Sequence, residues 1–392
     1  REASGRKPGA QPGHPGHSRK KQTPNQTVLL QPSQEILDDS DFKKTGKTVT
    51  KQLVNVQLCL NVIEYKADVY RDIKTGELYH AEFPDGVADD VNYGSSVRAF
   101  LFLLNNDCCV SIDKCRDFLK NLTDGKLDIS KGMISKLSKE FSEKSEALRR
   151  SAVSEMFLSP VIHTDCTNAR VNGQRAYVFI CAAPDGPALY YARGAKGHAG
   201  VAGTPVEDYQ GILIHDHEKT FYKYGSAHQE CLAHVLRYLK GSIENEPERT
   251  WNKDMHSLLQ EMVHYVNGVE SGEERDSVKI HEYETRYAQV LKTASSEYED
   301  IPCSDYYREG FNLAARMNVY RDAHLLFLHD SRVPTTNNLA ERLLRFIKRK
   351  QNQAMSFRSI KSLEFLCDSM SVLFLMRQED GNLYDKVSAV FG

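Results

Sequence analysis

The sequence predicts a mixed α/β fold, on two observations. First, the chain contains several short apolar strands, two of which are joined by a hairpin signal, Pro184-Asp185-Gly186. A long amphipathic helical pattern follows these strands. In chain order, these segments are VIHTD (161–165), RAYVFICAA (175–183), ALYYARG (188–194), GILIHD (211–216) and the helical AHQECLAHVLRYLKGSI (227–243). Second, two of the strands end in an acid. The order strand, hairpin, strand, helix favours a mixed sheet covered by helices.

Length and composition limit the class of protein. The chain has 392 residues, enough for about two to four domains. Its 40% hydrophobic and 27% charged residues are typical of a folded protein. A net charge of −2 excludes a uniformly basic surface, so any site for a polyanion must come from local concentrations of charge.

The nine cysteines form neither a disulfide framework nor paired zinc-binding motifs. Scattered thiols favour a reducing compartment, and we expect a cytoplasmic protein. The longest apolar run, residues 99–104, is far shorter than the ~18 residues that span a membrane. Position 1 is Arg rather than Met, so we expect a fragment or processed product that lacks an upstream segment.

Four regions follow one another along the chain. Residues 1–25 are rich in Pro and Gly and carry a charge of +5 over residues 1–22, which predicts a flexible basic arm. Such an arm suits phosphate contact, although a plain linker explains the composition equally well. In residues 26–90, alternating strand formers over 47–83 predict a small β-rich module.

Residues 91–150 change to helical periodicity. We expect two short helices joined across Asp124-Gly125, with Ser130 as the N-cap of the second. This arrangement resembles a helix-turn-helix, which indicates either DNA binding or an ordinary helical hairpin.

Residues 151–392 contain the α/β domain, with a mostly helical, acidic insertion at about 240–325. Within it, residues 244–300 hold 14 Asp and Glu against six Lys and Arg. The last predicted helix follows Pro334, and its buried stripe consists of Leu339, Leu343 and Ile347.

Three acids are the candidate catalytic and metal-binding residues. Asp165 and Asp216 each end an apolar strand, at the rim where α/β folds gather their sites, and Glu341 lies on the last predicted helix. Carboxylates brought together repel one another unless a cation lies between them. Hard divalent ions bind such acids, and two ions can promote in-line attack on a phosphodiester.

Taken singly, each acid has an ordinary explanation, such as a turn cap or an i, i+4 pair of Glu341 with Arg345. The charge near Glu341 favours chemistry, because residues 342–361 carry seven Lys and Arg and no acid. Arg345 and Lys348 lie on the face of Glu341, which suits contact with nucleic acid.

The chain resembles DDE transposases of the insertion-sequence-66 type, the TnpC subunit. The resemblance rests on four blocks: GRKPGAQPGHPGH (5–17), VIHTDCTNARVNGQRAYVF (161–179), YQGILIHDHEKTFYKYGSAHQECLAH (209–234) and NNLAERLLRFIKRKQN (337–352). It implies an RNase H-like catalytic domain that uses two Mg²⁺ or Mn²⁺ ions. By motif, the family's triad falls on Asp165, Asp216 and Glu341.

The resemblance also implies the activity and the partners. Water would cut the phosphodiester at the element's ends, and the freed 3′-hydroxyl would attack target DNA. We expect a homo-oligomer on bacterial nucleoid DNA, helped by small accessory proteins. The candidate DNA contacts are Arg6, Lys7, Arg193, Lys196, His234, Arg342, Arg345 and Lys348. Two alternatives stay open: a non-catalytic DNA-binding relic, and a metal-dependent nuclease without strand transfer.

A C-x-x-H motif, Cys231 to His234, follows the second acid, as in several DDE families. The two residues share a helix face, so His234 reaches either the metal site or a DNA phosphate, or is a structural histidine. A zinc site is not expected, because no second ligand pair has suitable spacing.

Overall fold

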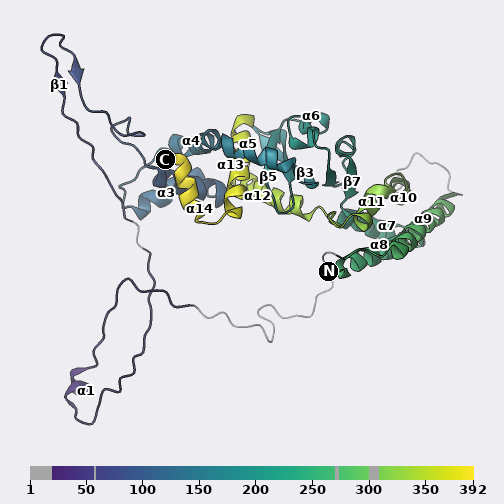
Figure 1. Ribbon diagram of the computed structural model, residues 1–392, viewed down its shortest axis with the longest axis horizontal. Helices are drawn as coiled ribbons and strands as arrows, with labels where there is room; N and C mark the ends of the chain where they lie inside the picture. Colours follow the sequence, from purple (N-terminus) through teal and green to yellow (C-terminus); the bar gives the residue numbers. More distant parts are fainter. Residues whose placement is uncertain (1–19, 57–58, 270–272, 300–308) are drawn as a thin grey trace. The chain divides into compact units, whose positions relative to one another are not determined.

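The computed structural model describes residues 20–56, 59–269, 273–299 and 309–392, and the chain divides into two compact units, residues 1–63 and 64–392 (Figure 1). In the first unit every described residue is exposed. Its one described helix, α1 (Gln34–Asp38), buries no residue. Lys21 Nζ donates to Thr50 O over 3.0 Å, and Gln22 N donates to Gln52 Oε1 over 2.9 Å. Polar contacts thus hold this unit's described part without an apolar core.

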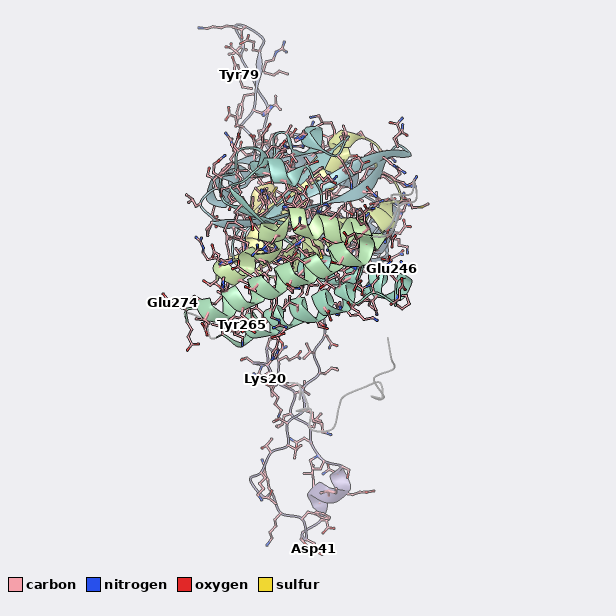
Figure 2. All side chains as sticks on the ribbon, turned by 90° about the vertical axis from the view of Figure 1, so that its right-hand side faces the viewer. Lys20, Asp41, Tyr79, Glu246, Tyr265 and Glu274 are labelled. Carbon is pink, nitrogen blue, oxygen red and sulfur yellow. The ribbon has the colours of Figure 1, made fainter. Side chains whose placement is uncertain are left out.

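The β-rich module predicted for residues 26–90 has only a small counterpart. The strands described there are β1 (Tyr70–Arg71) and β2 (Leu78–Tyr79), an antiparallel pair whose Tyr79 is labelled in Figure 2. The other strand formers, such as Val54 and Val56, stay 66% and 90% exposed. The expectation was wrong in extent, because alternation stabilises a strand only when one face can pack against a partner.

The centre of the second unit is a five-stranded mixed sheet. Its strands are β3 (Val161–Val171), β4 (Gln174–Ala182), β5 (Ala188–Arg193), β6 (Ile212–His215) and β7 (Ala227–Glu230). The order is β5-β4-β3-β6-β7, with β3 antiparallel to β4 and parallel to β6. The mixed α/β fold is therefore confirmed, and its topology is compatible with an RNase H-like domain.

Two details of this sheet differ from expectation. The first strand runs to Val171 and turns into β4 through Asn172-Gly173, whose φ angles of 48° and 76° favour a tight hairpin. Residues 227–230 form a strand rather than the start of a helix. They pair in parallel with β6, and that tertiary pairing overrides their weak strand propensity.

Helices cover both faces of the sheet. On β4, Val178 and Ile180 point to one side, while Phe179 and Cys181 point to the other, as a two-residue period requires. The first side packs against α12 (Asn338–Ala354) and α13 (Ile360–Gln378). The same apolar core continues beyond them into α2 (Ser95–Phe102), α3 (Ile112–Leu122), α4 (Lys131–Lys144) and α14 (Leu383–Phe391). The second packs against α5 (Glu146–Met156) and the segment around α6 (His198–Val201).

The predicted helical hairpin is present as α3 and α4. Asp124 and Gly125 both have positive φ in the connection, and Ser130 Oγ accepts from Met133 N over 3.1 Å at the start of α4. These helices share one apolar core with the sheet, so residues 91–150 do not build a separate core of their own.

A helical bundle follows β7 and packs near β6. It consists of α7 (Leu232–Asn245), α8 (Trp251–Gly268), α9 (Ser277–Glu299), α10 (Glu309–Val319) and α11 (Arg321–His329). Figure 2 labels Glu246, just after α7, and Tyr265 on α8. Trp251 is fully buried in its core. Across the described parts of the chain, every helix is too short or too polar to cross a bilayer.

Candidate metal centre

Two adjacent parallel strands bring the first two acids to corresponding positions. His163 of β3 is paired with Ile214 of β6, so Asp165, which lies inside β3 rather than at its end, is level with Asp216, the first residue after β6. The residues before them are buried, whereas both acids are only partly buried. The sheet therefore presents two carboxylates side by side where β6 ends.

Asn337 fixes the start of α12 against the same strands. Its side chain donates from Nδ2 to Thr164 O over 3.0 Å, and its Oδ1 lies 2.9 Å from His163 Nδ1. Its backbone N donates to Cys231 Sγ over 3.2 Å. Since Asn337 is completely buried, these bonds tie α12 to β3 and to the residue that precedes α7. Glu341, one turn later, is thereby held near the end of β6, where it lies beside His234.

Cys231 and His234 approach the acids from the start of α7. Cys231 N donates to His215 O over 2.9 Å, which turns the chain from β7 into the helix. His234 Nδ1 then lies 3.0 Å from Asp216 Oδ1 and 3.7 Å from Glu341 Oε1. Donor atoms of Asp216, Cys231, His234 and Glu341 all lie within 4.8 Å of one another.

Asp165 is electrostatically coupled to this cluster. Burial and the neighbouring charges of Asp216 and Glu341 raise the pKa of Asp165 to about 7, although Cys166 N donates to its Oδ1 over 2.6 Å. Contact with Asp216, and then with Cys231, raises the pKa of His234 to about 10. The protonated imidazole is therefore the positive charge that the pocket itself supplies to its carboxylates.

The donor set fits a divalent cation. Asp216 Oδ1 and His234 Nδ1 are both buried and pair with each other over 3.0 Å. One imidazolium does not balance three neighbouring carboxylates, so a divalent cation is a natural further partner for them. Carboxylate oxygens of Asp165, Asp216 and Glu341 are suitable ligands for Mg²⁺ or Mn²⁺.

Among the predicted DNA contacts, two cations make hydrogen bonds within the protein. Arg193 donates to the carbonyl oxygens of Ala192 and Ala202, and its guanidinium lies 5.3 Å above the Tyr191 ring. Lys348 Nζ donates to Asn168 O over 2.7 Å, which joins α12 to β3. Both side chains thus also stabilise the fold.

The other predicted cations are more available. Lys196, Arg342 and Arg345 are exposed and form no ion pair with any described residue. Burial raises the pKa of Cys166, next to Asp165, to about 11, and the nearby Lys196 ammonium opposes that rise. Arg6 and Lys7 lie outside the described residues.

Arg316 of α10 is a cation that the sequence did not single out. Its Nε and Nη2 atoms are buried without a hydrogen-bond partner in the described structure, and its guanidinium lies 4.8 Å above the Tyr238 ring. The ring of Tyr238 lies 6.4 Å from that of His234. No local sequence signal could have found this residue, because the contact joins two helices that are far apart in the chain.

Comparison with models of known protein families gives a match. Residues 91–364 match the family model described as "Transposase IS66 family". This range contains all three acids, the Cys231–His234 motif and the five strands of the mixed sheet. A search of curated proteins finds no match.

Proposed function

The chain belongs to the IS66 transposase family, and from that premise we propose that it is a DDE-type enzyme that cuts and joins DNA with bound metal ions. The observation that carries the proposal is the convergence of three acids. Asp165 lies within β3 beside the end of β6, Asp216 directly follows β6, and Glu341 approaches them from α12. Such mutual repulsion among carboxylates is relieved when a cation binds between them.

In this proposal, Asp165 and Asp216 together hold two Mg²⁺ or Mn²⁺ ions, and Glu341 completes the coordination of one. The bound ions supply Lewis-acid stabilisation of the attacking and leaving oxygens. Asn337 holds the start of α12, and with it Glu341, against β3. Further along α12, Lys348 donates to the backbone oxygen of Asn168 and so also holds the helix against β3. The protein's own residues thus supply a preformed donor set rather than one assembled by the substrate.

The substrate in this proposal is DNA, both the ends of the element and the target. Water cuts the phosphodiester at the element's end, and the freed 3′-hydroxyl then attacks target DNA. Lys196, Arg342 and Arg345 are the proposed phosphate contacts, because they are exposed and cationic. The basic arm with Arg6 and Lys7 would add salt-dependent affinity. We also propose assembly into an oligomer on DNA, with small accessory proteins.

A strand-transfer assay with Mg²⁺ tests this function. Asp216→Asn should abolish both cleavage and joining, because it removes a carboxylate shared by the proposed ion sites. Asp208→Asn is the matched control, since Asp208 is an exposed acid in the loop before β6. Equal activity of the wild type and Asp216→Asn would defeat the proposal.

The same assay separates the alternatives. Salt-dependent DNA binding without metal-dependent cutting would identify a non-catalytic relic. Cleavage that never yields branched joint products would identify a nuclease without strand transfer.

A further inference from the structure

Two donor sets overlap in the pocket. One is the set of three acids, Asp165, Asp216 and Glu341, on which the proposed function rests. The other contains Asp216, Cys231, His234 and Glu341, the four residues whose donor atoms lie within 4.8 Å of one another. Asp216 and Glu341 belong to both sets, so a cation held by the second set would withdraw two carboxylates from the first.

The second set is rigidly held. Cys231 is 1% exposed, and its sulfur accepts a hydrogen bond from Asn337 N, which fixes the position of the sulfur. Cys231 is the residue just before α7 and His234 lies in the first turn of that helix, so the start of α7 holds both side chains close to the carboxylates. The carboxylates arrive from β6 and α12, and they supply the second ligand pair that local sequence spacing did not reveal.

The chemistry of these four donors differs from that of the three acids. Thiolate, imidazole and two carboxylates make a four-ligand set, which is the number that closed, tetrahedral zinc sites use. Mg²⁺ prefers oxygen ligands in octahedral geometry and keeps several waters, so a thiolate does not suit it. The two sets therefore select different metal ions at one place.

We propose that Asp216, Cys231, His234 and Glu341 form a binding site for Zn²⁺ that competes with the metal ions of the catalytic acids. Zn²⁺ binding releases the Cys231 thiol proton and the His234 imidazolium proton to solvent. The filled site leaves Asp165 without its partner carboxylates, and so holds the pocket in a metal-bound, inactive state. This inhibitory role rests on the proposed function, whereas the metal binding itself does not.

Cobalt substitution tests the binding directly. Co²⁺ is titrated into the reduced, metal-free full chain, and the readout is the near-ultraviolet charge-transfer band that a thiolate bound to cobalt produces. Wild-type protein should show this band at one ion per chain, and one equivalent of Zn²⁺ should remove it. The test variants are Cys231→Ser and His234→Gln. The matched controls are Cys166→Ser, a thiol beside the pocket, and Asp165→Asn, an acid outside the four donors.

The expected pattern is specific. Cys231→Ser should lose the band, and His234→Gln should weaken Zn²⁺ affinity beyond the roughly 10–100-fold that loss of an outer-sphere partner costs. Both controls should keep the band, and Cys166→Ser should also bind Zn²⁺ as the wild type does. Thermal unfolding of each variant shows that it is folded. No band in the wild type, or a band that survives in Cys231→Ser, would overturn the proposal.

The outcome is separable from that of the proposed function. If the band behaves as expected but Mg²⁺ supports no cutting of DNA, the zinc site stands and the catalytic proposal fails. If the wild type cuts and joins DNA with Mg²⁺ but shows no cobalt–thiolate band, the catalytic proposal stands and the zinc site fails.

Discussion

Residues 47–83 and residues 161–193 are both rich in strand-forming residues, yet only the second stretch is part of an extensive sheet. In the second, β3, β4 and β5 have helices on both faces, and Ile180 is fully buried. In the first, the described side chains lie almost entirely in solvent, and one short hairpin forms. The difference teaches that residues with high strand propensity form a sheet only where that sheet can pack against other elements. The acids of the metal site lie in the packed region, where the sheet and its helices fix their positions.

The largest difference in stability is expected between a truncated side chain in the core of the sheet and one in the exposed N-terminal stretch. Ile180→Ala should lower the free energy of unfolding by about 2–5 kcal/mol, because it leaves a cavity between the sheet and its helices. Val56→Ala should change it by less than about 0.5 kcal/mol, since Val56 is 90% exposed. Urea unfolding measures both. A similar loss in the two variants would show that the N-terminal stretch packs against an apolar surface after all.

A smaller difference in stability is expected from the buried ammonium group of Lys350. Burial lowers the pKa of Lys350 on α12 to about 8, from 10.5, and its ammonium donates to Asn105 O. The folded state then holds the proton less tightly than the unfolded state. Stability should therefore rise as pH increases from about 8 to about 10, by roughly 2 kcal/mol.

Lys350→Met should remove this component of the pH dependence, because methionine keeps the apolar length and carries no proton. Lys51→Met in the exposed stretch is the control, and it should leave the profile as it is in the wild type. Unfolding free energies measured at pH 7, 8.5 and 10 check both variants. If Lys350→Met keeps the wild-type slope, Lys350 is not the group responsible.

The smallest effect compares two helix starts. Ser130 caps α4 through its side chain, whereas Ser33 precedes α1 and makes no such bond. Ser130→Ala should cost about 1 kcal/mol, and Ser33→Ala should cost almost nothing. Thermal unfolding of the two variants gives the answer. Equal costs would mean that α1 contributes to the cooperative fold as much as α4 does.

Sequence patterns were sufficient for the elements that local chemistry determines. The hairpin around Pro184-Asp185-Gly186 and the Ser130 cap depend on a few adjacent residues, and both are present. The strand β7 was assigned to a helix, because four residues with weak propensity became a strand only through pairing with β6. Most of the strands predicted for residues 47–83 do not form in the described part of that stretch, for the opposite reason. Their residues have a high strand propensity but no surface against which a strand could pack.

The candidate site shows the same limit. The apolar runs were enough to place Asp216 directly after β6, but the prediction that Asp165 ends its strand was wrong, because pairing with β4 extends β3 to Val171. The roles of Asn337 and Arg316, and the approach of Cys231 to Glu341, depend on contacts between segments more than 70 residues apart, which no local pattern encodes. Distant contacts of this kind become visible only after folding.

The buried amide of Asn337 has one further consequence. Its bonds to Thr164, His163 and Cys231 fasten α12 to the sheet and to the start of α7, without using α8, α9 or α10. The distances among the acids therefore do not depend on α8, α9 or α10, although these helices separate Asp216 from Glu341 in the chain. Shortening α8 and α9 is therefore expected to leave the distances among the acids unchanged.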